Sequence, residues 1–185
     1  MSYARDQGYP APAVSDAGAG YLVMERLDGP TMLQDVLARP AHLRRHARVL
    51  ADLHRRLHEI AALPGLPGVE VDGDRLLHRD LHPLNVLMTS RGPVVIDWAN
   101  CACGGPAYDV ADAWVLLATG DVPGSRLDRA SAAIGRRVFL RRFLAELDVA
   151  AARAAIPAVV RHRLADRHMS DAEKARMRRM AQRAS

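Results

Sequence analysis

Residues 78–97 constrain the fold of this chain more than any other stretch. They begin with His-Arg-Asp-Leu-His-Pro-Leu-Asn at positions 78–85, and an apolar run, 86–88, follows directly. A turn-forming Thr-Ser-Arg-Gly at 89–92 and a proline then lead into a second apolar run, 94–96. Two short apolar runs on either side of a turn predict a β-hairpin. The stretch is therefore expected to form a polar loop followed by a tight pair of strands.

Three polar side chains lie at the open end of this predicted hairpin. Folding the stretch about Arg91 places Asn85 opposite Asp97, and cross-strand neighbours have Cβ atoms about 5 Å apart. An amide oxygen and a carboxylate at that spacing can share one small hard cation such as Mg²⁺. Asp80 and Asn85 also fit the pattern H-R-D-L-x-x-x-N, in which the Asp orients an attacking hydroxyl for phosphoryl transfer. The spacing therefore predicts a metal-assisted site.

Each of these residues also has an ordinary structural explanation. Asp80 is suited to closing an Asx-turn, Asn85 to capping the start of a strand, and Asp97 to the turn after one. A functional site explains all three at once, because the motif and a hairpin of matching length occur together. We therefore take Asp80, Asn85 and Asp97 as the candidate site.

The motif resembles the catalytic segment of the aminoglycoside phosphotransferase and choline kinase family, which are small-molecule relatives of protein kinases. The resemblance rests first on residues 78–85 and on Ile-Asp-Trp at 96–98. Residues 21–29, 50–54 and 105–111 are similar to the strand and linker between the two lobes of that family, to a helix before the catalytic loop, and to the segment after the metal Asp. Asp-Trp in place of Asp-Phe-Gly, with no Ala-Pro-Glu after it, favours a small-molecule substrate over a protein.

This resemblance implies an α+β, protein-kinase-like fold with a mostly helical C-terminal lobe, a small catalytic β-hairpin and only a remnant of the N-terminal β lobe. The implied domains are residues 1–29, the remnant with the inter-lobe linker, and residues 30–185, the catalytic lobe. The implied activity is ATP-dependent transfer of the γ-phosphate to a hydroxyl of a small molecule.

The resemblance also assigns roles to individual residues. Asp80 is the expected catalytic base, and Asn85 and Asp97 are the expected ligands of Mg²⁺. Asp109 is expected to hold the catalytic loop from the helix that follows, although an acid near a helix N-terminus is also favoured by the helix dipole. The remaining implied contacts are to the adenine of ATP, from the backbone of Glu25, Arg26 and Leu27.

Two parts of a complete kinase are missing from the sequence. The clamp on the nucleotide phosphates uses a Gly-rich loop and a strand lysine. The chain has one lysine, Lys174, and its Gly18-Ala19-Gly20 does not complete the loop pattern. The sequence leaves three explanations open: a true start site further upstream, a catalytically inactive remnant acting as a nucleotide-binding or interaction module, or a separate partner that supplies the missing N-terminal lobe.

Composition narrows the class of protein. An apolar share of 49% and a charged share of 25% are typical of a globular chain. No apolar run is long enough for a membrane span, and the N-terminus lacks a signal-peptide core, so we expect a cytoplasmic protein without a membrane partner. The net charge of +5 comes mostly from arginines between apolar helical positions. With aromatics at only 4%, we expect solvated helix surfaces rather than a nucleic-acid site.

In most of the remaining chain, apolar residues recur at helical spacing, which predicts helices. The expected helices are 31–38, 40–60, 108–118, 127–147, 150–166 and 170–184. Thr31 and Ser170 are expected N-caps, and Pro157 is expected to kink or divide its helix. His54 lies on the apolar stripe of the second helix and is expected to be a hydrogen-bonded core residue.

Other segments are expected to be extended or irregular. Residues 1–20, rich in Gly, Ala and Pro, are predicted to be extended and turn-forming rather than helical. Residues 16–20 are predicted to be a hairpin connection, followed by a strand at 21–25. A short strand at 76–77 is expected to lead into the catalytic loop. A turn at 120–124 is expected to end the helix predicted at 108–118. Cys101 and Cys103 are too few and too close for a structural zinc site and are expected to be reduced thiols.

Overall fold

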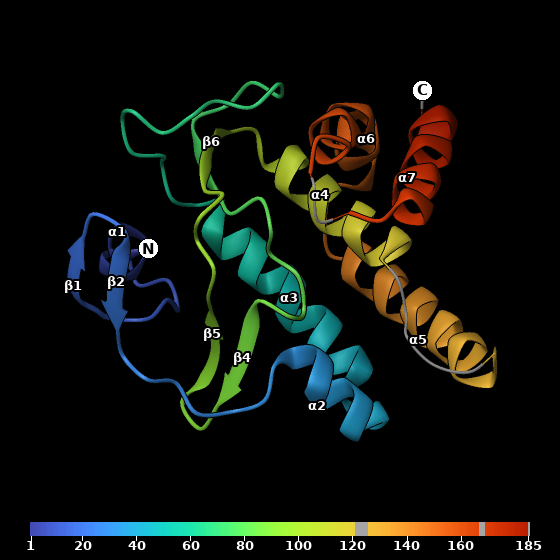
Figure 1. The fold of residues 1–185 in the computed structure, drawn as a ribbon, viewed down its shortest axis with the longest axis horizontal. Helices are drawn as coiled ribbons and strands as arrows, with labels where there is room; N and C mark the ends of the chain where they lie inside the picture. Colours follow the sequence, from blue (N-terminus) through green and yellow to red (C-terminus); the bar gives the residue numbers. More distant parts are fainter. Residues whose placement is uncertain (121–125, 167–168, 185) are drawn as a thin grey trace.

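The computed structural model describes residues 1–120, 126–166 and 169–184 and shows an α+β arrangement of helices with three small sheets (Figure 1). The helices are α1 (Ser2–Asp6), α2 (Met32–Ala38), α3 (Leu43–Leu57), α4 (Pro106–Thr119), α5 (Arg126–Leu144), α6 (Val149–Arg163) and α7 (Asp171–Ala184), with a 3-10 helix η1 over Pro40–His42. The strands are β1 (Val14–Gly18), β2 (Tyr21–Met24), β3 (Arg75–Leu77), β4 (Val86–Thr89), β5 (Gly92–Val95) and β6 (Ala102–Gly104). Each sheet is an antiparallel pair: β1 with β2, β3 with β6, and β4 with β5.

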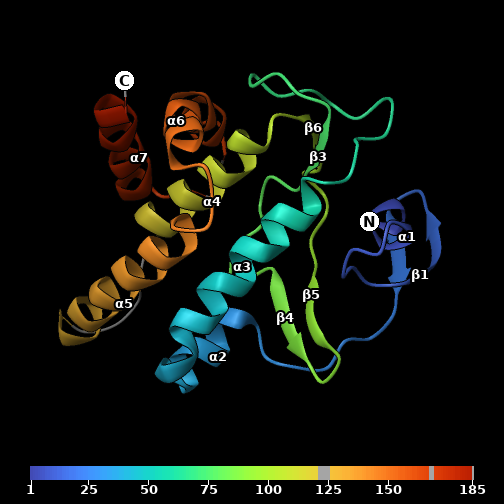
Figure 2. The ribbon, with the colours of Figure 1, turned by 180° about the vertical axis from the view of Figure 1, so that it is seen from behind.

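The helical part of the molecule is organised around α4. This helix packs against α5, α6 and α7, and α3 packs against α5. Figures 1 and 2 show the β1–β2 sheet toward one end of the molecule and α7 toward the other, with α3 and the other two sheets between them. The predicted buried helix at 108–118 is therefore confirmed as α4, the central helix of this lobe. None of the described helices has the length and apolar character needed to cross a membrane.

The sequence pattern of α2 and α3 is confirmed in most respects. Thr31 caps α2 in a full capping box, because its hydroxyl accepts from the Gln34 amide and the Gln34 side chain accepts from the Thr31 amide. Pro40 opens a 3-10 turn rather than the α-helix itself, which begins at Leu43. His54 lies in the core and its Nδ1 bonds to the Leu50 carbonyl, as expected.

The predicted hairpin is confirmed as β4–β5, with a register one residue away from the expected one. Val86 pairs with Val95 and Thr89 with Gly92, so the loop is only two residues long. Gly92 has a φ of +109°, a conformation that favours glycine and closes this short loop. Asn85 consequently lies opposite Ile96 instead of Asp97, and the Ile96 amide donates to the Asn85 carbonyl at 3.0 Å.

The N-terminal segment contains the predicted hairpin and one helix that the sequence did not predict. Ser2–Asp6 forms α1, and its Ala4 is fully buried in the core. A helix this short is not stable alone, so its packing decides its formation. Tyr9 fastens the segment to the helical lobe by an edge contact with Trp98, at 5.6 Å between ring centroids, and by a hydrogen bond to the Leu53 carbonyl. A domain boundary at residue 29 stays a prediction.

The C-terminal helices follow the prediction except at Pro157. This proline lies inside α6, which runs unbroken from Val149 to Arg163, so it does not divide the helix. Ser170 and Glu173 form the predicted capping box in front of α7. The predicted turn at 120–124 falls mostly outside the described residues. Cys101 and Cys103 are free thiols.

Candidate active site

The loop that carries Asp80 is held in place by Asp109, in the first turn of α4. The carboxylate of Asp109 is buried and accepts hydrogen bonds from the His78 amide at 3.1 Å and the Arg79 amide at 2.6 Å. His58, at the end of α3, lies 3.1 Å from the same carboxylate. Burial works to raise the pKa of Asp109, but the hydrogen bond and charge of His58 outweigh it and hold that pKa below its usual range. Asp109 is therefore an ionised acceptor at the base of the loop.

Two residues of the candidate site region have a backbone with positive φ. Among the described residues, the non-glycine residues with positive φ are Arg79, at 61°, and Asp97, at 64°. This conformation costs free energy for a residue with a side chain, and such residues gather at functional sites. One of these residues directly precedes Asp80, and the other, Asp97, lies two residues after the end of β5. The strand alternation of β5 therefore does not extend to the Asp97 side chain.

His78 connects the two chain segments that carry the site. Its Nε2 lies 3.1 Å from the Ile96 carbonyl, and its ring packs on Trp98 at 4.8 Å between centroids. The side chain is fully buried, and this burial lowers the pKa of His78 and favours the neutral ring, which donates from Nε2. His78 thus acts as a structural link between the catalytic loop and the strand that leads to Asp97.

Asp80 and Asn85, two of the predicted site residues, are in direct contact. The Asn85 amide nitrogen donates to the Asp80 carboxylate (Oδ2) and to the Asp80 carbonyl, both at 2.9 Å. In this orientation the Asn85 oxygen is turned away from Asp80. No hydrogen bond within the described part of the chain occupies that oxygen or the Asp97 carboxylate. The structure brings Asp80 and Asn85 together, and Ile96, the residue before Asp97, bonds to the Asn85 backbone.

A buried ion-pair network that the sequence did not predict surrounds Asp80. Arg163, the last residue of α6, donates to the Asp80 carboxylate (Oδ1) at 2.8 Å and to the Arg79 carbonyl at 2.7 Å. The same guanidinium forms a two-pronged pair with Asp112 on α4, at 2.7 and 2.5 Å. Arg163 and Asp112 are 7% and 2% exposed, so both charges are removed from water. No local pattern could have indicated Arg163, which lies 83 residues from Asp80.

The pKa values of Asp80 and Asp112 are shifted in opposite directions within this network. Burial works to raise the pKa of Asp80, but the hydrogen bonds and charges of His82 and Arg163 outweigh it and hold that pKa below its usual range. Burial dominates at Asp112 and raises its pKa to about 6, although Arg163 opposes the shift. Asp80 is therefore ionised at neutral pH, which suits a group that accepts a hydrogen bond from a hydroxyl.

The predicted adenine-contact residues lie between β2 and α2. The Glu25 carboxylate pairs with Arg91 at 2.9 Å and accepts from the Ala13 amide at 3.1 Å, so the linker is fastened to the β4–β5 loop. These contacts hold the pKa of Glu25 below its usual range, with the Arg91 hydrogen bond as the largest cause. Arg26 is exposed and pairs with Asp28.

Two surface hollows in the described part of the chain lie outside this site. One is lined by residues of the N-terminal segment and of the end of α3, including Tyr9 and Arg56, and the other by His58, Val110 and the 145–148 segment. Neither is lined by Asp80, Asn85 or Asp97. The candidate site is thus identified by its hydrogen bonds and charges, and not by the depth of a cavity.

The loop thus holds an aspartate and an asparagine in contact and is anchored by a buried acid of α4. Residues 71–147 match the model of the phosphotransferase enzyme family, which supports membership of the chain in that family. The matched region includes Asp80, Asn85, Asp97 and Asp112, whereas Arg163 lies outside it. Among curated proteins, none matches this chain.

Proposed function

We propose that this chain is an ATP-dependent phosphotransferase with a protein-kinase-like fold, acting on a hydroxyl group of a small molecule of the aminoglycoside or choline kinase type. The observation that carries the proposal is the direct contact between Asp80 and Asn85 on a loop held by Asp109. The family match over residues 71–147, which includes these residues, also supports the proposal.

In this proposal Asp80 positions the acceptor hydroxyl and takes its proton. Its two carboxylate oxygens already accept from Asn85 and Arg163, which fixes the orientation of the group. An ionised aspartate with a lowered pKa is a weak base. That is compatible with phosphoryl transfer, because the transition state is loose and positioning contributes more than basicity.

Asn85 and Asp97 are the proposed ligands of Mg²⁺. The Asn85 oxygen is turned away from its partner Asp80, and it and the Asp97 carboxylate are the hard oxygen donors that this ion prefers. Bound magnesium would neutralise charge on the nucleotide phosphates. The backbone of Glu25 to Leu27 would meet the adenine, since it lies in the linker that Arg91 fastens to the hairpin.

The decisive experiment measures binding and transfer separately. Calorimetry with Mg²⁺-ATP should show binding to the wild-type chain and its loss in Asp97→Ala. Asp52→Ala is the matched control, because Asp52 is a half-exposed aspartate on α3 whose ion pair among the described residues is with Arg55. Phosphate transfer to a panel of amino sugars, amino alcohols and sugars should occur with wild type and disappear in Asp80→Asn, while nucleotide binding remains.

Two outcomes would contradict this function. Equal Mg²⁺-ATP binding by wild type and Asp97→Ala would remove Asp97 from the metal site. Binding that depends on Asp97 without transfer to any acceptor would favour the alternative of a non-catalytic, nucleotide-binding remnant.

A further inference from the structure

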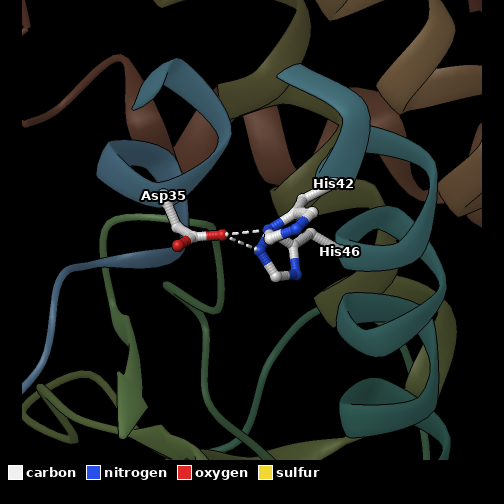
Figure 3. A group of neighbouring side chains, drawn as sticks. All are labelled: Asp35, His42 and His46. Carbon is white, nitrogen blue, oxygen red and sulfur yellow. Dashed lines mark hydrogen bonds and ion pairs between the residues drawn. The ribbon is translucent and has the colours of Figure 1, made fainter. Parts of the chain in front are cut away.

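A cluster of two histidines and an aspartate lies away from the candidate active site. Asp35 is on α2, His42 ends the 3-10 helix η1, and His46 is in the first turn of α3. One ligand atom from each side chain lies within 4.8 Å of the other two. Figure 3 shows both imidazole rings turned toward one oxygen of the Asp35 carboxylate.

The positions of the three residues follow from the helices that carry them. His42 and His46 are four residues apart, a spacing that puts both rings on one face of the chain as it enters α3. Asp35 reaches this face from α2, and its Oδ2 lies 2.8 Å from His42 Nδ1 and 2.6 Å from His46 Nε2. The other oxygen of Asp35 pairs with Arg39. The carboxylate thus has one oxygen directed at the rings and one held by an outer partner, as in many metal sites.

Burial and hydrogen bonding leave the cluster open to an ion. Asp35 and His46 are each 3% exposed, whereas the His42 side chain is 34% exposed and gives access from solvent. His46 Nδ1 is buried and has no hydrogen-bond partner among the described residues, so the 2.6 Å contact with the Asp35 carboxylate holds the ring proton on Nε2. A metal ion that binds at Nε2 would take the place of this proton.

We propose that Asp35, His42 and His46 form a binding site for Zn²⁺, with water at the remaining position. Two imidazoles and a carboxylate are ligands that Zn²⁺ accepts, and three protein ligands with water in the fourth position are a known zinc coordination. At Zn–ligand bonds of about 2.0–2.1 Å, tetrahedral ligand atoms are roughly 3.3 Å apart, so the ligand atoms must separate by roughly 0.6 Å. Movement of the partly exposed His42 can supply the separation from Asp35 on its own side, whereas the Asp35–His46 pair would separate by a small shift of α2 relative to α3.

Zinc at this position would join α2 to α3. The Leu33 amide of α2 donates to the Pro83 carbonyl of the catalytic loop at 3.1 Å, so α2 also borders the candidate active site. Bound zinc would thereby stabilise the packing of α2 against α3 and against the catalytic loop. This inference rests on the fold and on the cluster, and it holds whether or not the chain transfers phosphate.

The test uses the full chain, freed of metal with a chelator and titrated with Zn²⁺ in a calorimeter. Wild type is expected to bind one Zn²⁺ tightly. His42→Ala should weaken this binding by about 100-fold or more, since loss of even an outer-shell partner costs about 10–100-fold. His82→Ala is the control, because His82 is a histidine beside Asp80 that could itself attract zinc. It should bind like wild type.

Two further readouts keep the test decisive. Co²⁺ in place of Zn²⁺ should give the intense visible absorption of a tetrahedral site in wild type and His82→Ala, and not in His42→Ala. Circular dichroism checks that His42→Ala, altered at a partly exposed position, stays folded. Absence of tight binding in wild type, equal binding by His42→Ala, or loss of binding in His82→Ala would each overturn the proposal and leave the cluster as an ion-pair contact between two helices.

Discussion

Replacing Arg163 with Met should destabilise this protein far more than replacing Arg161, two residues earlier on the same helix. Arg163 is buried and pairs with Asp112 and Asp80, whereas Arg161 is mostly exposed and pairs with the half-exposed Glu70. Methionine keeps much of the apolar stem of arginine and removes the charge and the hydrogen bonds. The comparison therefore isolates the effect of burying an ion pair.

The expected loss can be assembled from the structure. At pH 7 a lone buried Asp112 takes up a proton. The pKa of Asp112 is already raised to about 6 in wild type. Removal of Arg163 therefore increases the free-energy cost of burying this group at pH 7 by only about 1 kcal/mol. The lost hydrogen bonds to the Asp80 carboxylate and the Arg79 carbonyl add about 1–3 kcal/mol each. The total of about 3–7 kcal/mol overlaps the usual cost of about 3–5 kcal/mol for removing one partner of a buried pair.

Thermal and urea unfolding measure this difference. For a chain of this size the loss lowers Tm by about 10 °C. Arg161→Met should unfold close to wild type, because its ion pair is exposed to solvent. The double variant Arg163→Met with Asp112→Leu should recover part of the loss, since a buried apolar pair does not need a counter-charge. If Arg163→Met unfolds at the same temperature as Arg161→Met, the buried network does not stabilise the fold as argued.

Two other predictions concern the acids of α4. Asp109→Ala leaves the buried amides of His78 and Arg79 without an acceptor and should cost about 2–6 kcal/mol in urea unfolding, whereas the exposed control Asp52→Ala should cost little. Equal effects of the two would show that the loop does not depend on Asp109. The pKa of Asp112 is raised from 3.8 to about 6, so this group contributes stability below about pH 4 that is lost as pH rises through about 6. Asp112→Asn lacks this titration, so its free energy of unfolding relative to wild type should rise by about 3 kcal/mol between pH 4 and pH 7. A flat or falling difference would contradict the assigned burial effect.

Local patterns predicted the elements whose stabilising contacts lie within a few residues. The capping boxes at Thr31 and Ser170 and the β4–β5 hairpin appear in the structure because each depends on neighbours along the chain. Helix α1 was missed because its stability comes from the burial of Ala4 against distant residues. The hairpin register was misplaced by one residue, since it depends on where the two-residue loop closes.

By itself the sequence determined which polar residues stand on the loop before the hairpin, because the motif spacing and the turn are properties of neighbouring positions. The tertiary structure alone decided what surrounds them. Arg163 reaches Asp80 and Asp112 from a helix far along the chain, and Asp35 meets two histidines across a helix junction. Such contacts depend on how helices pack, and packing depends on the whole core, so no spacing in the sequence encodes them.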